Sequence, residues 1–214
     1  MSVNLRRLPH ARPLRALALG MRCLRYLSGT RDHGIHLCTQ RSERSGSPQS
    51  TLEAYGDASY EEGYAQTGVV VKLNGMLISW KSTKQTQAPR STAESECTAM
   101  AYSSQFLEGI TCLYHSMHVP LDKPVLYRGN RAAAHISSGS SEWRTKALAN
   151  RILGVRSLIE LGYLGVQFMP TADMQADALT KFLSAKVLAR QRKLVGCVPP
   201  PSQRAGRCGG RGWG

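Results

Sequence analysis

The sequence predicts one α/β domain, built on a mixed five-stranded sheet with helices on both of its faces. The segments 68–73 (GVVVKL) and 76–82 (MLISWKS) are apolar and rich in β-branched residues, and Asn74-Gly75 joins them. This dipeptide supplies the positive φ angles of a two-residue hairpin turn. Helical and strand patterns then alternate to about residue 183. Antiparallel strands followed by alternating helices and strands give a mixed sheet that helices cover.

The remaining elements of this domain can be placed in order along the chain. A first strand over residues 52–59 is expected to pair antiparallel with the hairpin. Ser91 or Thr92 can cap a long helix, whose apolar residues recur at helical spacing. Four further elements complete the domain: a short buried strand at 125–127, a second long helix at 143–161, a last strand at 166–169 and a final helix at 172–182.

The domain is flanked by segments of different composition. Residues 39–50 contain no large apolar residue and are expected to form a linker. Residues 197–214 are rich in Pro, Gly and Arg, and we expect them to form a disordered tail. Residues 11–28 predict an amphipathic helix that ends at Gly29, because five large apolar residues share one face of it: Leu14, Leu17, Met21, Leu24 and Leu27.

The net charge of +14 lies entirely in the flanking regions. Residues 1–50 carry nine Arg and two acidic residues, and residues 184–214 carry seven Lys or Arg and no acidic residue. The residues between them, 51–183, carry twelve basic and twelve acidic residues. Basic flanks can hold a nucleic acid through counterion release without reading its sequence. They can equally serve only to keep the chain soluble, and the sequence leaves both interpretations open.

Cysteine spacing and hydropathy bear on whether the protein is intracellular and whether it contacts a membrane. The six cysteines form no CxxC pair and have no histidine at zinc-like spacing. This favours a reduced, intracellular protein, in the cytoplasm or the nucleus. No apolar run approaches the ~20 residues that span a bilayer, so we expect no membrane partner. The Arg-rich, acid-poor N-terminus also resembles an organelle transit peptide.

Three acidic residues suggest a metal-dependent nuclease. Asp57 lies in the first strand, Glu96 near the start of the long helix and Asp177 on the final helix. Side chains so placed can meet at one end of a mixed sheet, where clustered carboxylates repel each other unless they share divalent cations. Two such ions roughly 4 Å apart can activate a water and stabilise the leaving oxygen in phosphodiester hydrolysis. Taken singly, however, a surface Asp or Glu is usually only solvated.

Six blocks follow one another along the chain: YGDASY, ISWKSTKQ, STAESECTAM, LYRGNRAAAHI, EWRTKALANRILGVRSLI and ADMQADALTKFL. In sequence and order they resemble the ribonuclease H domain of Ty1/copia retrotransposon Pol polyproteins. The resemblance covers about residues 52–196 and implies a ribonuclease H-like fold for 51–196. It also implies Mg²⁺- or Mn²⁺-dependent cleavage of RNA within RNA–DNA hybrids. Residues 1–38 resemble the connection helix at the end of the reverse transcriptase region, which makes a reverse transcriptase domain a candidate partner.

The resemblance assigns Asp57 as the ligand shared by both metal ions, with Glu96 holding one ion and Asp177 the other. The third aspartate of the family follows an aromatic and a small residue at the end of its strand, and this position falls on Gly129. Gly129 offers no side-chain ligand. A histidine that family members carry after an Arg-Thr-Lys run is also absent, because Ala147 follows Lys146.

We therefore expect weak or absent hydrolysis, and a gain of cleavage in Gly129→Asp. Four residues are expected to contact nucleic acid: Arg128, Asn130, Arg144 and Lys146. Arg128 could instead form a salt bridge where a metal ion once sat, or reflect neutral drift. Two alternatives to an impaired nuclease remain open, a non-catalytic nucleic-acid-binding module and an inert retroelement relic.

Overall fold

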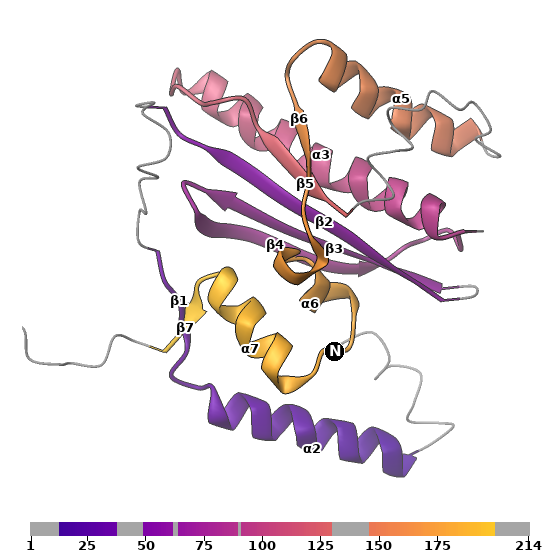
Figure 1. Cartoon of the computed structure of the whole chain (residues 1–214), viewed down its shortest axis with the longest axis vertical. Coiled ribbons are helices and arrows are strands. Elements are labelled where there is room, and N and C mark those ends of the chain that lie inside the picture. Colours follow the sequence, from indigo (N-terminus) through magenta and orange to yellow (C-terminus); the bar gives the residue numbers. More distant parts are fainter. Residues whose placement is uncertain (1–12, 38–48, 62–63, 90, 130–145, 200–214) are drawn as a thin grey trace, which may run out of the picture.

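The computed structural model describes residues 13–37, 49–61, 64–89, 91–129 and 146–199 (Figure 1). Residues 39–48 of the expected linker and 200–214 of the expected tail lie outside them. The elements are, in chain order, α2 (Pro13–Gly29), β1 (Gly34–Ile35), β2 (Leu52–Glu61), β3 (Tyr64–Leu73), β4 (Met76–Lys84), α3 (Thr92–Ser116), β5 (Val125–Arg128), α5 (Lys146–Glu160), β6 (Gly165–Phe168), the 3₁₀ turn η1 (Thr171–Asp173), α6 (Asp177–Thr180), α7 (Ala185–Leu194) and β7 (Cys197–Val198).

The mixed five-stranded sheet is confirmed, with strand order β4-β3-β2-β5-β6. The strands β2, β3 and β4 are antiparallel neighbours. The strand β5 pairs parallel with both β2 and β6. The hairpin turn has the predicted chemistry, because Asn74 has a φ of 52° and Gly75 a φ of 77°. The antiparallel half of the sheet is therefore set by a local turn, and the parallel half by the crossover through α3.

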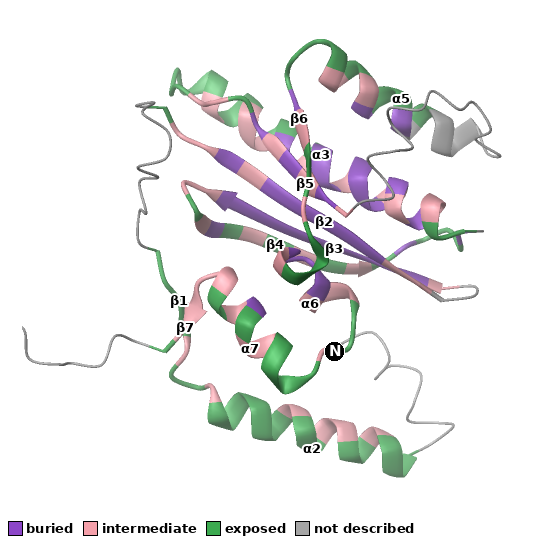
Figure 2. Ribbon diagram, viewed as in Figure 1, coloured by how far each residue is buried: buried purple, intermediate pink, exposed green. Residues whose placement is uncertain are grey.

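Helices cover both faces of the sheet (Figure 1). The helices α3 and α5 pack on one face, where Ala54, Leu126 and Met100 belong to one apolar core. The turn η1 and helix α6 lie over the other face, where Tyr55 packs with Met174 and others in a second core. Figure 2 shows the buried residues running along the central strands and the inner side of α3. Because side chains alternate along a strand, neighbouring residues of β2 point to different helices.

The predicted final helix over 172–182 is wrong. This stretch forms η1 and the four-residue helix α6, and Lys181 is already extended. Between the two, Met174 is extended, which buries both Met174 and Ala176 against the sheet. Tertiary packing has here overridden local helix propensity. A separate helix, α7, then begins at Ser184, whose side chain accepts the N–H of Val187.

The N-terminal flank is joined to the end of the domain by a second, two-stranded sheet. The strands β1 and β7 pair antiparallel, and the His36 N–H donates to the Gly196 carbonyl over 2.8 Å. Cys197 and Val198, which the sequence analysis assigned to the tail, therefore form a strand. The buried Lys72 of β3 donates to the Leu194 carbonyl at the end of α7. This contact fastens α7 to the sheet and satisfies a helix-end carbonyl.

The amphipathic helix α2 is confirmed, and none of its residues is buried. Its apolar face is open, with Leu14 82% exposed and Leu24 61% exposed. The Arg192 guanidinium of α7 lies over the Tyr26 ring of α2, 5.4 Å from the ring centre. In the described part of the chain, no helix is both long and apolar enough to cross a bilayer.

Helix α6 packs closely against β3 at a point where the strand carries Gly68. A Cβ atom on Gly68 would lie 2.7 Å from the Thr180 Cγ2 atom and 2.9 Å from the Ala176 carbonyl oxygen. We expect Gly68→Ala to push α6 away from the sheet and to lower the free energy of unfolding by about 1–3 kcal/mol, the usual cost of overpacking. Urea denaturation measures this.

The matched control for this prediction is Gly109→Ala. Gly109 lies in α3, and a Cβ there would meet no described atom within 4 Å. We expect this variant to stabilise the protein by about 1 kcal/mol, the difference in helix propensity between Gly and Ala. Equal stability of Gly68→Ala and the natural chain would contradict close packing of α6.

Candidate functional site

Asp57 and Asp177 are brought together where β2 passes beneath α6. Asp57 faces α6, because the neighbouring Gly56 faces α3, where a Cβ would lie 2.5 Å from the Ser103 Oγ atom. Asp177 is the first residue of α6, and both carboxylates are almost fully buried. The Thr180 hydroxyl donates to Asp57 Oδ2. Packing of α6 on the sheet thus places two carboxylates side by side.

A lysine lies between these two carboxylates. The Lys181 Nζ atom is 2.8 Å from Asp177 Oδ1 and 3.2 Å from Asp57 Oδ2. Burial lowers the pKa of Lys181, but Asp57 and Asp177 outweigh it and the net shift is upward. Burial raises the pKa of Asp177, which the hydrogen bond from Lys181 opposes and the charge of Asp57 reinforces. Lys181 therefore stays charged and compensates both acids.

Glu96 is held separately, by a buried arginine. Arg128 ends β5, and its side chain is 0% exposed. Its Nη2 atom donates to Glu96 Oε2 and to the Glu96 carbonyl oxygen, each over 2.7 Å. Within the described part of the chain, the Arg128 Nε and Nη1 atoms are buried and find no acceptor. The guanidinium group thus depends on Glu96 for its compensation.

The pKa shifts of Glu96 and Arg128 both disfavour the charged form of the residue. Burial raises the pKa of Glu96, Arg128 lowers it, Asp57 raises it, and the net shift is upward. Burial lowers the pKa of Arg128 more than Glu96 raises it. Both shifts have burial as their largest cause, so the pair sits in a region of low polarity. The effect of Asp57 on Glu96 also indicates that the three carboxylates belong to one electrostatic cluster.

Arg128 corrects one expectation from the sequence. We expected it to contact nucleic acid, but its fully buried side chain presents no surface to a phosphate. The salt bridge with Glu96 is the alternative that the structure contains.

Lys181 was missed by sequence reasoning, although its signal was present. It follows Asp177 by four residues, the spacing at which acid and base meet on a helix.

Of the other predicted site residues, the structure describes Gly129 and the backbone of Lys146. Gly129 directly follows Arg128, and a Cβ there would meet no described atom within 4 Å. Asn130 and Arg144 lie outside the described residues. Lys146 begins α5, and its side chain is likewise outside the described part.

These groups do not fit a pair of divalent cations. The oxygens of Asp57 and Asp177 converge on an ammonium group, and those of Glu96 lie on a guanidinium group. Position 129 supplies no ligand atom. Among the described residues, no group of three or more His, Cys, Asp or Glu side chains is arranged to hold a metal ion. The acids are instead neutralised by the chain's own cations, Lys181 and Arg128.

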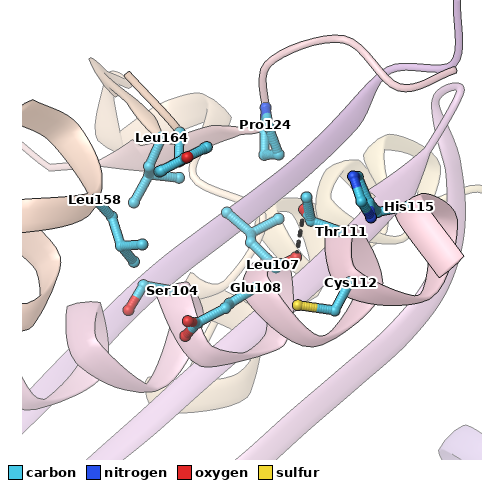
Figure 3. Close-up of a pocket in the computed structure, with 10 residues that line it drawn as sticks. Ser104, Leu107, Glu108, Thr111, Cys112, His115, Pro124, Leu158 and Leu164 are labelled. Carbon is cyan, nitrogen blue, oxygen red and sulfur yellow. Dashed lines mark hydrogen bonds between the residues drawn. The ribbon is translucent and has the colours of Figure 1, made fainter. Parts of the chain in front are cut away.

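A separate cavity of about 380 Å³ lies between α3, α5 and the segment before β6 (Figure 3). Its wall is mostly apolar, and Leu107, Leu158 and Leu164 contribute to it. The cavity borders the second half of α3, from Ser104 to His115, and not the turn that carries Glu96. It is therefore distinct from the acidic cluster.

Comparison with known proteins identifies relatives of the chain. It is 35% identical over 196 residues, 88% of its length, to the retrovirus-related Pol polyprotein from transposon RE2 of Arabidopsis thaliana. It is 34% identical over 187 residues to the polyprotein from transposon RE1 of the same plant. It is 30% identical over 144 residues to the transposon Ty1-DR5 Gag-Pol polyprotein of Saccharomyces cerevisiae. The chain is a homologue of the Ty1/copia-type Pol polyproteins.

The homologous region is a small part of each relative. The chain spans 13% of the RE2 polyprotein, 12% of the RE1 polyprotein and 8% of the Ty1-DR5 polyprotein. No protein-family model matches this Pol homologue.

Solved structures similar to this Pol homologue include ribonucleases H. The N-terminal RNase H domain of a Mycobacterium tuberculosis protein is 12% identical, with a TM-score of 0.46, covering 68% of this chain and 98% of that one. LC11-RNase H1 in complex with an RNA/DNA hybrid is 15% identical, with a TM-score of 0.45, covering 61% of this chain and 93% of that one.

Removal of the Lys181 charge should leave Asp57 and Asp177 to repel each other. In Lys181→Ala we expect the free energy of unfolding at pH 7 to fall by about 1–2 kcal/mol, less than for a fully buried pair because Lys181 is 40% exposed. Without the cation, the folded-state pKa of Asp177, which burial already raises, moves further above its unfolded value. The folded state then binds more protons than the unfolded state, so stability falls as pH rises through that window.

Thermal denaturation of Lys181→Ala between pH 4 and pH 8 checks this. The loss relative to the natural chain should be small at the acid end and largest at neutral pH. The control is Lys186→Ala, which removes an exposed lysine of α7 and should leave the profile unchanged. A loss that does not depend on pH would show that Lys181 acts through packing alone.

Proposed function

We propose that this chain is a ribonuclease H-like domain of a copia-type Pol polyprotein that hydrolyses RNA in RNA–DNA hybrids weakly or not at all. Homology supplies the ancestral reaction, Mg²⁺- or Mn²⁺-dependent endonucleolytic cleavage of the RNA strand. One observation carries the proposed impairment: each carboxylate expected to hold a metal ion already binds Lys181 or Arg128, and Gly129 contributes no carboxylate.

The same contacts also occupy carboxylate oxygens of Asp57 and Asp177 that a general base would use. A general base must have an unshared oxygen within hydrogen-bond reach of the attacking water. Asp57 accepts hydrogen bonds from Thr180 and Lys181, and Asp177 accepts one from Lys181. The loss of general base catalysis alone removes roughly 10²–10⁴-fold in rate. This domain is therefore proposed to keep the ancestral fold while having lost most of the ancestral chemistry.

A second candidate function is non-catalytic binding of nucleic acid. Helices α2 and α7 lie side by side (Figure 1). Both carry exposed basic residues. Arg190 is paired with Asp173, but other side chains of the two helices extend into solvent. Such a surface supports binding to the phosphates of an RNA–DNA hybrid or another nucleic acid. The exposed basic residues are Arg15, Arg22, Arg25, Lys186 and Lys193.

The homology also suggests a protein partner. The apolar face of α2 is exposed, and in a polyprotein this helix would lie close to the preceding domain. A reverse transcriptase domain is therefore proposed as the partner of α2.

Cleavage of a labelled RNA–DNA hybrid tests the impairment. With Mg²⁺ or Mn²⁺, we expect the natural chain to give no more cleavage than Asp57→Asn, because Asp57 is already bound within the protein. A ribonuclease H from another source serves as the positive control for the substrate. Cleavage by the natural chain that Asp57→Asn abolishes would mean a working nuclease and would contradict the proposal.

The salt dependence of hybrid binding tests the second candidate. Each phosphate contact contributes about 0.9 to the slope of log K against log salt concentration on B-form DNA. We expect the triple variant Arg15→Gln, Arg22→Gln, Arg25→Gln to weaken binding and to reduce this slope. The control is Lys123→Gln, an exposed lysine that lies just before β5. Equal slopes for the triple variant and the natural chain would remove α2 from the binding surface.

A further inference from the structure

We propose that Arg128 is a built-in counter-ion that takes the place of a divalent cation at Glu96. An aspartate restored at position 129 therefore cannot by itself rebuild a metal site. This inference rests on the proposed function, because it treats the acidic cluster as a former metal centre. It adds a second cause of the impairment, which lies one residue before the missing aspartate.

The side chain of Arg128 is far less exposed to solvent than that of Lys181. The Lys181 side chain is 40% exposed, so its flexible stem can turn toward solvent and release Asp57 and Asp177. The Arg128 side chain is 0% exposed and lies beneath α3. Nearby Cys97 is also buried, and burial raises the pKa of its thiol to about 11. Arg128, unlike Lys181, is therefore closed off from water in the folded structure.

The charge of Arg128 also resists removal. A guanidinium group does not lose its proton in proteins, so a buried arginine must keep an anion beside it. Glu96 is the carboxylate that contacts it, and two of the three guanidinium nitrogens already lack an acceptor among the described residues. A divalent cation that bound Glu96 would bring two positive charges against this group. Like charges this close in a region of low polarity repel strongly.

Space at position 129 is not the obstacle. A Cβ atom on Gly129 would contact no described atom within 4 Å, and its φ is not in the left-handed region. The backbone therefore accepts an aspartate there. This changes the expectation from the sequence that Gly129→Asp would regain cleavage, because Glu96 would still be held by Arg128. Both positions must change before the acids can share a metal ion.

Titration with Mn²⁺ tests this directly, without reliance on catalysis. The proteins to compare are the natural chain, Gly129→Asp, Arg128→Met, and the double variant Arg128→Met/Gly129→Asp. Methionine is unbranched and apolar, so it fills part of the arginine volume while removing the charge. Mn²⁺ binding is measured by isothermal calorimetry and by the rise in melting temperature that a ligand of the folded state produces.

We expect a saturable response in the double variant, with an affinity for Mn²⁺ about tenfold or more above that of Gly129→Asp, because a close like charge has been removed. The natural chain should show no saturable response. Adding Asp57→Asn to the double variant is the matched control and should abolish the response. Equal affinity of Gly129→Asp and the double variant would overturn the inference, as would a folded double variant without any response.

A second substitution covers the case in which Arg128→Met does not fold. Arg128→Gln keeps a polar side chain but carries no charge, and the same Mn²⁺ comparison applies to it. The cleavage assay keeps the two proposals separate. Cleavage by the natural chain would reject the proposed impairment, whereas the difference in Mn²⁺ affinity between Gly129→Asp and the double variant decides the role of Arg128.

Discussion

Compensation of buried negative charge is the constraint on which this structure depends. Asp57, Glu96 and Asp177 lie in one electrostatic cluster at the sheet, and carboxylates cannot be buried together unless positive charge lies beside them. This chain supplies that charge from its own side chains. Lys181 joins two of the acids and Arg128 holds the third. The same ion pairs also fix the positions of α6 over one face and the start of α3 over the other, so charge compensation and fold are coupled.

The fold brings the acidic residues and their cations together from distant parts of the sequence. Alternation along β2 sends Asp57 to the face covered by α6, while Gly56 allows Ser103 of α3 to approach the opposite face. Gly68 has no side chain, so α6 can pack directly on β3. This packing brings Asp177 and Lys181 to Asp57. The Arg128 side chain emerges from a parallel strand beside β2 and meets the start of α3. The internal salt bridges of Lys181 and Arg128 therefore depend on the framework of the sheet and its helices.

Local signals in the sequence were sufficient for much of this fold. Asn74-Gly75 predicts the hairpin, and Ser91 caps α3, because turn and cap chemistry depend on a few adjacent residues. The final helix was predicted wrongly because burial of Met174 and Ala176 is decided by the sheet beneath them. The face to which Arg128 points could not be read from a strand of four residues. The β1–β7 pairing involves two residues on each strand, which is too short to leave a periodic pattern.

The double-mutant cycle between Arg128 and Glu96 tests the central claim most directly. The free energies of unfolding of the natural chain, Arg128→Met, Glu96→Gln and the double variant give the coupling between the two side chains. Glu96→Gln leaves the buried Arg128 unpaired, Arg128→Met leaves the partly buried Glu96 unpaired, and the double variant leaves neither charge. We therefore predict a favourable coupling of about 2 kcal/mol or more. A coupling near zero would mean that the acids are not held by the chain's own cations, and would contradict the account.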